Sequence, residues 1–276
     1  MKPSSPWRHE LRLFFIALQF LTRVPTPAWV GYQPEWLNQS ARHFPLVGAL
    51  VGAWSALLLC GAAWLWPASV AAIIALAASL WLTGAFHEDG LADTIDALGG
   101  AVPREKALAI MKDSRIGSYG AAAMVLGLGG RAVLWALLVS QSLWAAAAAL
   151  VLSACWGRLA AVLTMAWLPY AGDVEHAKAK PLAQSVGPAE LTWAIGWAVA
   201  AAAGAGLAWP AGRLAGALLA CLLVVWVMRR WLAKRLGGYT GDALGATEQL
   251  SEIAVLLAFA AVVPPGWYGW HGWALG

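Results

Sequence analysis

The stretch FHEDGLADTIDALGG, residues 86–100, places four acidic residues within nine positions, directly after a long apolar segment. Three of them, Asp89, Asp93 and Asp96, follow an i, i+4, i+7 spacing, which puts their carboxylates within roughly 60° on one face of an α-helix. Like charges on one face repel each other, and a cation would offset the repulsion. Because Mg²⁺ takes carboxylate oxygens and keeps positions open for substrate phosphates, we expect these three residues to bind Mg²⁺ and to be catalytic.

The two residues that precede Asp89 lie on other faces of the same helix. We expect His87 to contact substrate in the catalytic centre rather than to bind the metal, and Glu88→Ala to be much milder than changes at Asp89 or Asp93. The alternative is a solvated helix start, where acidic residues are favoured by the helix dipole. One carboxylate would be enough for that effect.

Two further segments suggest phosphate chemistry. In REKALAIMKDSRIGSYG, residues 104–120, Lys112 and Arg115 flank Asp113 just before a glycine-bounded helix start, and such cations and helix-start N–H groups together form an anion site. GGYTGDALGATEQLSE, residues 237–252, carries Asp242, followed by Glu248 and Glu252 at i, i+4 spacing. Helix capping and solvation explain Asp242 equally well.

The composition indicates a membrane protein. Of the 276 residues 61% are hydrophobic and 12% charged, against roughly 45–50% and 25% in soluble domains. We expect one all-α, polytopic membrane domain over residues 1–276, with an interfacial or re-entrant helix at 11–24. Since about 20 residues cross a bilayer, the expected spans are seven: 44–66, 68–86, 118–141, 143–168, 191–209, 213–232 and 250–263.

Alternating these spans predicts the orientation. The loops at 87–117, 169–190 and 233–249 fall on one side. The Lys and Arg residues lie on that side or at helix ends beside it, except Arg131, Arg158 and Arg213. The positive-inside rule makes that side cytoplasmic. We therefore expect a multi-pass protein of the inner membrane whose active site faces the cytoplasm.

Two arginines fall well inside predicted spans. A bare charge there is costly, so we expect Arg131 and Arg158 to face the bundle interior and meet anionic partners or a polar cavity. Arg158 is expected to contact a ligand or an acidic motif residue. Snorkelling toward the headgroups is the alternative.

Five segments together resemble one family. FLTRVPTP at 20–27, FPLVGALVG at 44–52, FHEDGLADTIDALGG, IMKDSRIGSYG at 110–120 and GGYTGDALGATEQLSE are similar in order and spacing to the cobalamin synthases, the adenosylcobinamide-GDP ribazoletransferases. Lys112 and Ser118 stand where some members have Arg and Thr, and both changes keep the chemical type. The positions that match the family's motifs are His87, Asp89, Gly90, Asp93, Asp96, Asp113, Ser114, Arg115, Gly117, Asp242, Gly245 and Glu248.

The resemblance implies a reaction. In this family α-ribazole, or its 5′-phosphate, attacks adenosylcobinamide-GDP to give adenosylcobalamin or its phosphate and GMP, with Mg²⁺ required. We expect the substrates to be bound by Lys112, Asp113, Ser114, Arg115, Gly117, Arg158, Asp242 and Glu248. Expected partners are these small molecules and the lipid bilayer, with a homo-oligomer or other pathway enzymes as further candidates, and no nucleic acid.

Two other functions are alternatives for this sequence. CDP-alcohol phosphotransferases are Mg²⁺-dependent membrane enzymes with repeated aspartates, but their Ala-Arg pair shortly after Asp-Gly is replaced here by LADTID after Gly90. A cation transporter would hold its coupling ion near the middle of the bilayer, whereas these carboxylates cluster at one edge.

Overall fold

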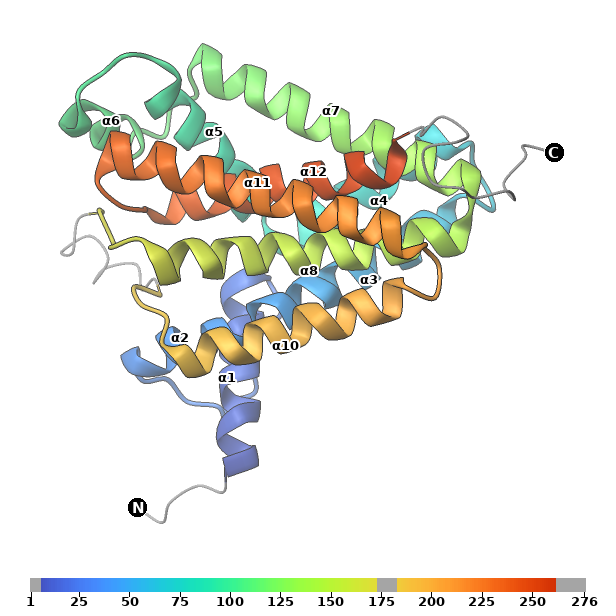
Figure 1. The fold of residues 1–276 in the computed structure, drawn as a ribbon, viewed down its shortest axis with the longest axis horizontal. Helices are drawn as coiled ribbons and strands as arrows, with labels where there is room; N and C mark the ends of the chain where they lie inside the picture. Colours follow the sequence, from blue (N-terminus) through green and yellow to red (C-terminus); the bar gives the residue numbers. More distant parts are fainter. Residues whose placement is uncertain (1–5, 173–182, 262–276) are drawn as a thin grey trace.

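The computed structural model describes residues 6–172 and 183–261, which are α-helical with short connections and contain no β-strand (Figure 1). The helices are α1 (Pro6–Leu21), α2 (Pro34–Ser40), α3 (Phe44–Ala62), α4 (Ala68–Thr83), α5 (Phe86–Gly99), α6 (Arg104–Ile110), α7 (Ser118–Gln141), α8 (Leu143–Trp167), α10 (Pro188–Ala205), α11 (Ala211–Leu236) and α12 (Gly241–Ala260), with a 3₁₀ turn η1 (Ala41–His43). The expected all-α architecture is confirmed.

Helix α8 lies at the centre of the bundle and packs against α3, α7, α10, α11 and α12 (Figure 1). Small residues allow this close packing. At Gly52 on α3, an added Cβ would lie 2.6 Å from the carbonyl oxygen of Leu150 on α8, so only glycine lets the two backbones approach. The outermost helices keep many apolar side chains exposed, among them Leu219 and Trp226 on α11, as expected for a surface that faces lipid.

Five helical segments in the described part of the chain are long and apolar enough to cross a membrane: 34–62, 118–141, 143–167, 211–236 and 241–260. Helices α4 and α5 pass the same test only as a pair, and they are bent by 89° at their junction. The described residues thus contain five candidate membrane spans, or six if the bent pair is one span, whereas we expected seven. The difference lies in α4 and α10, neither of which meets the criteria alone.

The three segments expected on one side of the membrane meet at one end of the bundle. Arg104, at the start of α6, donates hydrogen bonds to the carbonyls of Leu236 (2.7 Å) and Ala171 (3.1 Å). Arg235 in the last turn of α11 donates to Leu98 and Gly100 at 2.8 Å each. Part of the expected loop, 173–182, lies outside the described residues.

Helix α1 runs across the direction of the long helices (Figure 1), as a helix at a membrane surface does. It is anchored by Glu10, which accepts from Arg42 at 2.7 Å and pairs with His43 at 3.2 Å. Phe20, near its end, stacks on Phe44 of α3 with ring centroids 5.6 Å apart. The end of α1 is therefore brought to the same end of the bundle as the acidic motif.

Candidate active site at one end of the bundle

The acidic motif begins at a strained turn. Gly84 (φ 72°) and Ala85 (φ 57°) both adopt the left-handed conformation between α4 and α5. For Ala85 this conformation is uncommon, and such backbone strain is concentrated at functional sites. The amide of Arg23 donates to the carbonyl of Leu82 at 2.8 Å, so the segment after α1 helps to hold the turn. The 89° bend then directs α5 against α7 and α12.

Two motif glycines allow α5 and α12 to touch. A Cβ on Gly90 would lie 2.7 Å from the carbonyl oxygen of Asp242, and one on Gly245 would lie 3.1 Å from that of His87. A side chain at Gly90 would push the helices apart, and one at Gly245 would crowd the backbone of His87. The contact brings the start of α12, with Asp242, next to the carboxylates of α5. The first and last polar motifs of the sequence therefore lie side by side.

Asp93 lies at the centre of the acidic cluster, which comprises Asp89, Asp93, Asp96 and Asp242. On α5, a 14-residue helix outside the five spans, Asp89 is exposed while Asp93 and Asp96 are half-buried. Burial, followed by the charges of Asp89, Asp242 and Asp96, raises the pKa of Asp93 to about 7. Desolvation and like charges both disfavour the carboxylate form. The cluster accumulates negative charge that a bound cation would relieve.

Asp96 also has a structural role. Its two carboxylate oxygens accept hydrogen bonds from the backbone N–H groups of Gly117 and Gly120, each at 2.7 Å. These groups lie at the N-terminus of α7, where N–H donors have no partner within the helix. The charge of Asp96 also complements the helix dipole there. Asp96 thus ties α5 to the first turn of α7.

The chemistry of the donor set fits Mg²⁺. In the described residues no group of three His, Cys, Asp or Glu side chains is close enough to form a metal site by itself. Mg²⁺ does not require one, because it usually takes one or two carboxylates together with waters and substrate phosphates. Asp89 and Asp93, one helical turn apart with Asp242 beside them, supply carboxylates of that kind.

The segment 112–117 forms an exposed loop before α7. Arg115 is turned back on Asp113, with Nη2 and Oδ2 2.6 Å apart, and its side chain is 86% exposed. Hydrogen bonds from Arg115 lower the pKa of Asp113 to about 2, so the pair stays ionised at neutral pH. Lys112, Ser114 and Gly117 are exposed in the same loop. The expected phosphate-binding residues therefore border the acidic cluster through the contact of Gly117 with Asp96.

Both intramembrane arginines are buried and paired, as predicted. Arg131 on α7 contacts Glu88 at 2.6 Å and Glu252 at 3.4 Å, and Arg158 on α8 forms ion pairs with Glu248 and Glu252. In low dielectric a charge needs such partners. Arg158 thereby meets the acidic motif residue Glu248, as expected. Neither arginine snorkels to the surface.

This buried network changes the role of several sequence-predicted residues. Glu248 has no exposed surface and contacts Arg158 and Gln249, so its expected contact with substrate stays a prediction. Arg131 also donates to Glu88, whose replacement we expected to be mild, and to Gln249. The sequence carried part of this signal, since Arg131, Arg158 and Glu252 lie inside expected spans, where charges have to pair.

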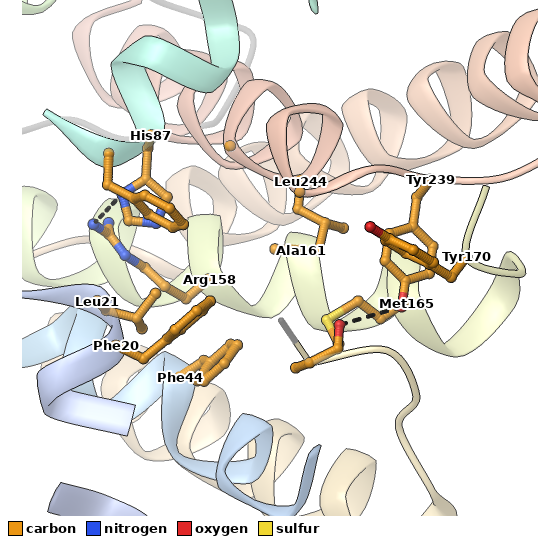
Figure 2. Close-up of a pocket in the computed structure, with 14 residues that line it drawn as sticks. Phe20, Leu21, Phe44, His87, Arg158, Ala161, Met165, Tyr170, Tyr239 and Leu244 are labelled. Atoms are coloured by element: carbon orange, nitrogen blue, oxygen red, sulfur yellow. Dashed lines mark hydrogen bonds between the residues drawn. The ribbon is translucent and has the colours of Figure 1, made fainter. Parts of the chain in front are cut away.

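An aromatic pocket opens beside the acidic cluster (Figure 2). Its walls come from α1, α3, α5, α8, α12 and the segments around residues 170, 183 and 239. Figure 2 shows Phe20 and Phe44 on one side and Tyr170 and Tyr239 on the other. The lining residues are Phe20, Leu21, Phe44, Phe86, His87, Arg158, Ala161, Met165, Tyr170, Ala183, Tyr239, Gly241, Leu244 and Gly245.

Sequence comparisons identify the family. Residues 13–260 match the family described as cobalamin-5-phosphate synthase. The chain belongs to this family. It is 56% identical to a protein of Leptothrix cholodnii named adenosylcobinamide-GDP ribazoletransferase, over 92% of this chain and 97% of that one. Proteins of the same name from Shewanella amazonensis and Vibrio parahaemolyticus are 42% and 38% identical, again over 92% of this chain and over 96% and 94% of theirs.

No solved structure matches the chain. The match to the cobalamin-5-phosphate synthase family includes the acidic cluster, the loop at 112–117, the buried ion pairs and the walls of the aromatic pocket. All residues that we expected to form the site are therefore within the family's matched region.

Proposed function

We propose that this protein is an adenosylcobinamide-GDP ribazoletransferase. The observation that carries the proposal is the family match over residues 13–260, joined to the meeting of the family's polar motifs at one end of a membrane bundle. A membrane transferase needs its charged groups where water-soluble phosphate substrates can reach them, and the cluster around Asp93 has that position.

The proposed reaction is a phosphoryl transfer. A ribose hydroxyl oxygen of α-ribazole, or of its 5′-phosphate, forms a bond to the phosphorus that carries the cobinamide. The P–O bond to GMP breaks, GMP leaves, and the hydroxyl proton passes to a carboxylate of the acidic cluster. Negative charge develops on the phosphoryl oxygens and the leaving phosphate, and catalysis rests on positioning and charge stabilisation.

The residues of the site support these roles. Asp89 and Asp93 would hold Mg²⁺, and Asp96 stays a proposed ligand because each carboxylate oxygen has two lone pairs. Bound Mg²⁺ would neutralise charge on the phosphoryl oxygens. Lys112 and Arg115 would bind the pyrophosphate. For Arg115 this means exchanging Asp113 for a phosphate, which its exposure permits.

The same arrangement supports a proposal for the cell location. We propose that the end carrying the acidic cluster faces the cytoplasm across the inner membrane. The charge distribution supports this orientation. A GDP-linked donor substrate is also made from a cytoplasmic nucleotide.

The test uses purified, detergent-solubilised protein with adenosylcobinamide-GDP and α-ribazole, with and without Mg²⁺. GMP release together with formation of a cobalamin product is expected only when both substrates and Mg²⁺ are present. A folded protein that releases no GMP, or that transfers a CDP-linked alcohol instead, would refute the proposed function.

A further inference from the structure

The aromatic pocket carries an inference that rests on the proposed function and deepens it. It adjoins the acidic cluster, because Gly241 lines its wall and Asp242 is the next residue. Gly245 and His87 belong to the same wall and form the contact between α12 and α5. A molecule bound in the pocket would therefore have one end beside the carboxylates.

The lining restricts what the pocket can hold. Flat faces come from Phe20 and Phe44 on one side and Tyr239 on the other, with Ala161, Met165 and Leu244 between them (Figure 2). Aromatic side chains bind planar rings by stacking and edge contacts. The shape and chemistry suit a flat apolar ring system.

The two ends of this pocket differ, since Tyr170 and Tyr239 lie at one end and Arg158 and His87 at the other. There Arg158 Nη2 lies 3.5 Å from His87 Nδ1, and both side chains are almost fully buried. At the far end the hydroxyl of Tyr239 donates to the carbonyl of Ala183 at 3.5 Å. A bound ring therefore meets Arg158 and His87 along one edge, and aromatic and aliphatic side chains with two tyrosine hydroxyls elsewhere.

We infer that this pocket binds the base of the acceptor nucleoside and selects a flat bicyclic base that is apolar over most of its rim. A benzimidazole, the base of α-ribazole, has one free ring nitrogen and otherwise apolar edges. Guanine has donors and acceptors around its rim, and the apolar walls would leave most of them without partners. The GDP moiety of the donor substrate thus binds elsewhere, on the side of the loop at 112–117.

The test narrows the pocket without changing Arg158 or His87. Ala161→Leu places a larger side chain in the cavity from α8, and Leu244→Phe does the same from α12, where Leu244 is only half-buried. The matched control is Ala166→Leu, the same substitution on the same helix at a half-buried position outside the pocket lining. Thermal unfolding verifies the fold of each variant.

The readout is the KM for each substrate, with equilibrium dialysis of labelled α-ribazole in the absence of the donor. We expect either pocket variant to raise the KM and the dissociation constant for α-ribazole at least about tenfold. The KM for adenosylcobinamide-GDP should stay within about twofold, and Ala166→Leu should change neither. A tenfold excess of guanosine should not displace α-ribazole from the wild type.

The outcomes separate this inference from the proposed function. Absence of GMP release by folded wild-type protein would refute the function and the inference together. Turnover with an unchanged α-ribazole affinity in both folded pocket variants, or an increase only in the donor KM, would overturn the pocket assignment alone. An unchanged α-ribazole affinity in both pocket variants is also the result expected if a lipid acyl chain occupies the pocket. Displacement by guanosine would overturn the selectivity.

Discussion

Arg131 on α7 and Glu88 on α5 form a buried ion pair with 2.6 Å between Nη1 and Oε1, and both side chains are at most 5% exposed. The pair connects the acidic helix to the interior of the bundle across 43 positions of sequence. Glu88 therefore belongs to the framework that holds α5, while its neighbour Asp89 is exposed on the face with Asp93.

The first prediction concerns this pair. Glu88→Ala removes one carboxylate partner of the buried Arg131. Removing one member of a buried ion pair lowers the free energy of unfolding by about 3–5 kcal/mol. We expect a markedly lower unfolding temperature in detergent and loss of activity in proportion to the unfolded fraction. The control is Glu105→Ala at an exposed position on α6, which should change little.

A double variant distinguishes pairing from a direct catalytic role. Replacing both charges, as in Glu88→Leu with Arg131→Met, removes the unpaired charge and should recover part of the stability lost in Glu88→Ala. Recovery of the unfolding temperature supports the ion-pair role. A stable but inactive Glu88→Ala protein would contradict it.

The second prediction tests the helix contact at the site. Gly90→Ala introduces a Cβ that would lie 2.7 Å from the carbonyl oxygen of Asp242, so α12 has to move away from α5. We expect at least a tenfold lower kcat, since small displacements of catalytic groups have large effects on rate. The control is Gly129→Ala on α7, where an added Cβ meets nothing within 4 Å. It should retain full activity and equal or slightly higher stability.

The fold was predictable where it depends on composition and periodicity. Spans 118–141 and 143–168 agree with α7 and α8 to within one residue, because turn residues and apolar length mark such helices clearly. The bend between α4 and α5 was not predictable, since it depends on Ala85 adopting a conformation that its residue type disfavours. The expected span at 68–86 ran through this junction for that reason.

The site was predictable in part for a similar reason. Helical spacing correctly separated the exposed face of Asp89 from that of Glu88, because it depends only on local geometry. The same argument could not assign a partner to Glu88, as this requires knowing that α5 packs against α7 and α12. Likewise Asp96 fits the helical face with Asp89 and Asp93, but its hydrogen bonds to Gly117 and Gly120 arise from tertiary contact.

The third prediction concerns orientation. In a background without Cys60, Cys155 and Cys221, single cysteines are introduced at Glu105 on α6 and at Gln141, both exposed and at opposite ends of the bundle. In intact cells an impermeant thiol reagent should label only the cysteine at Gln141, and both should react after lysis. External labelling of the Glu105→Cys protein would reverse the proposed topology.

The fourth prediction separates two kinds of aspartate on α5. Asp89→Asn and Asp93→Asn keep the side-chain shape but remove charge, so if these residues hold Mg²⁺ each should lower the rate at least about a hundredfold. Their unfolding temperatures should stay near that of the wild type, because both carboxylates lie at the surface or are half-buried. For Asp93→Asn the small difference should be a rise, since burial and the charges of Asp89 and Asp242 disfavour the Asp93 carboxylate.

Asp96→Ala should behave differently, because it removes both hydrogen bonds to the first turn of α7. Losing a cap typically costs about 0.5–2 kcal/mol, so the unfolding temperature should fall along with the rate. Each variant is assayed over a Mg²⁺ titration on protein of verified folding. Wild-type rates and Mg²⁺ dependence in both Asp89→Asn and Asp93→Asn would show that the cation binds elsewhere. An Asp96→Ala protein of unchanged stability would show that the contact with Gly117 and Gly120 does not hold α7, and would leave catalysis as the main role of Asp96.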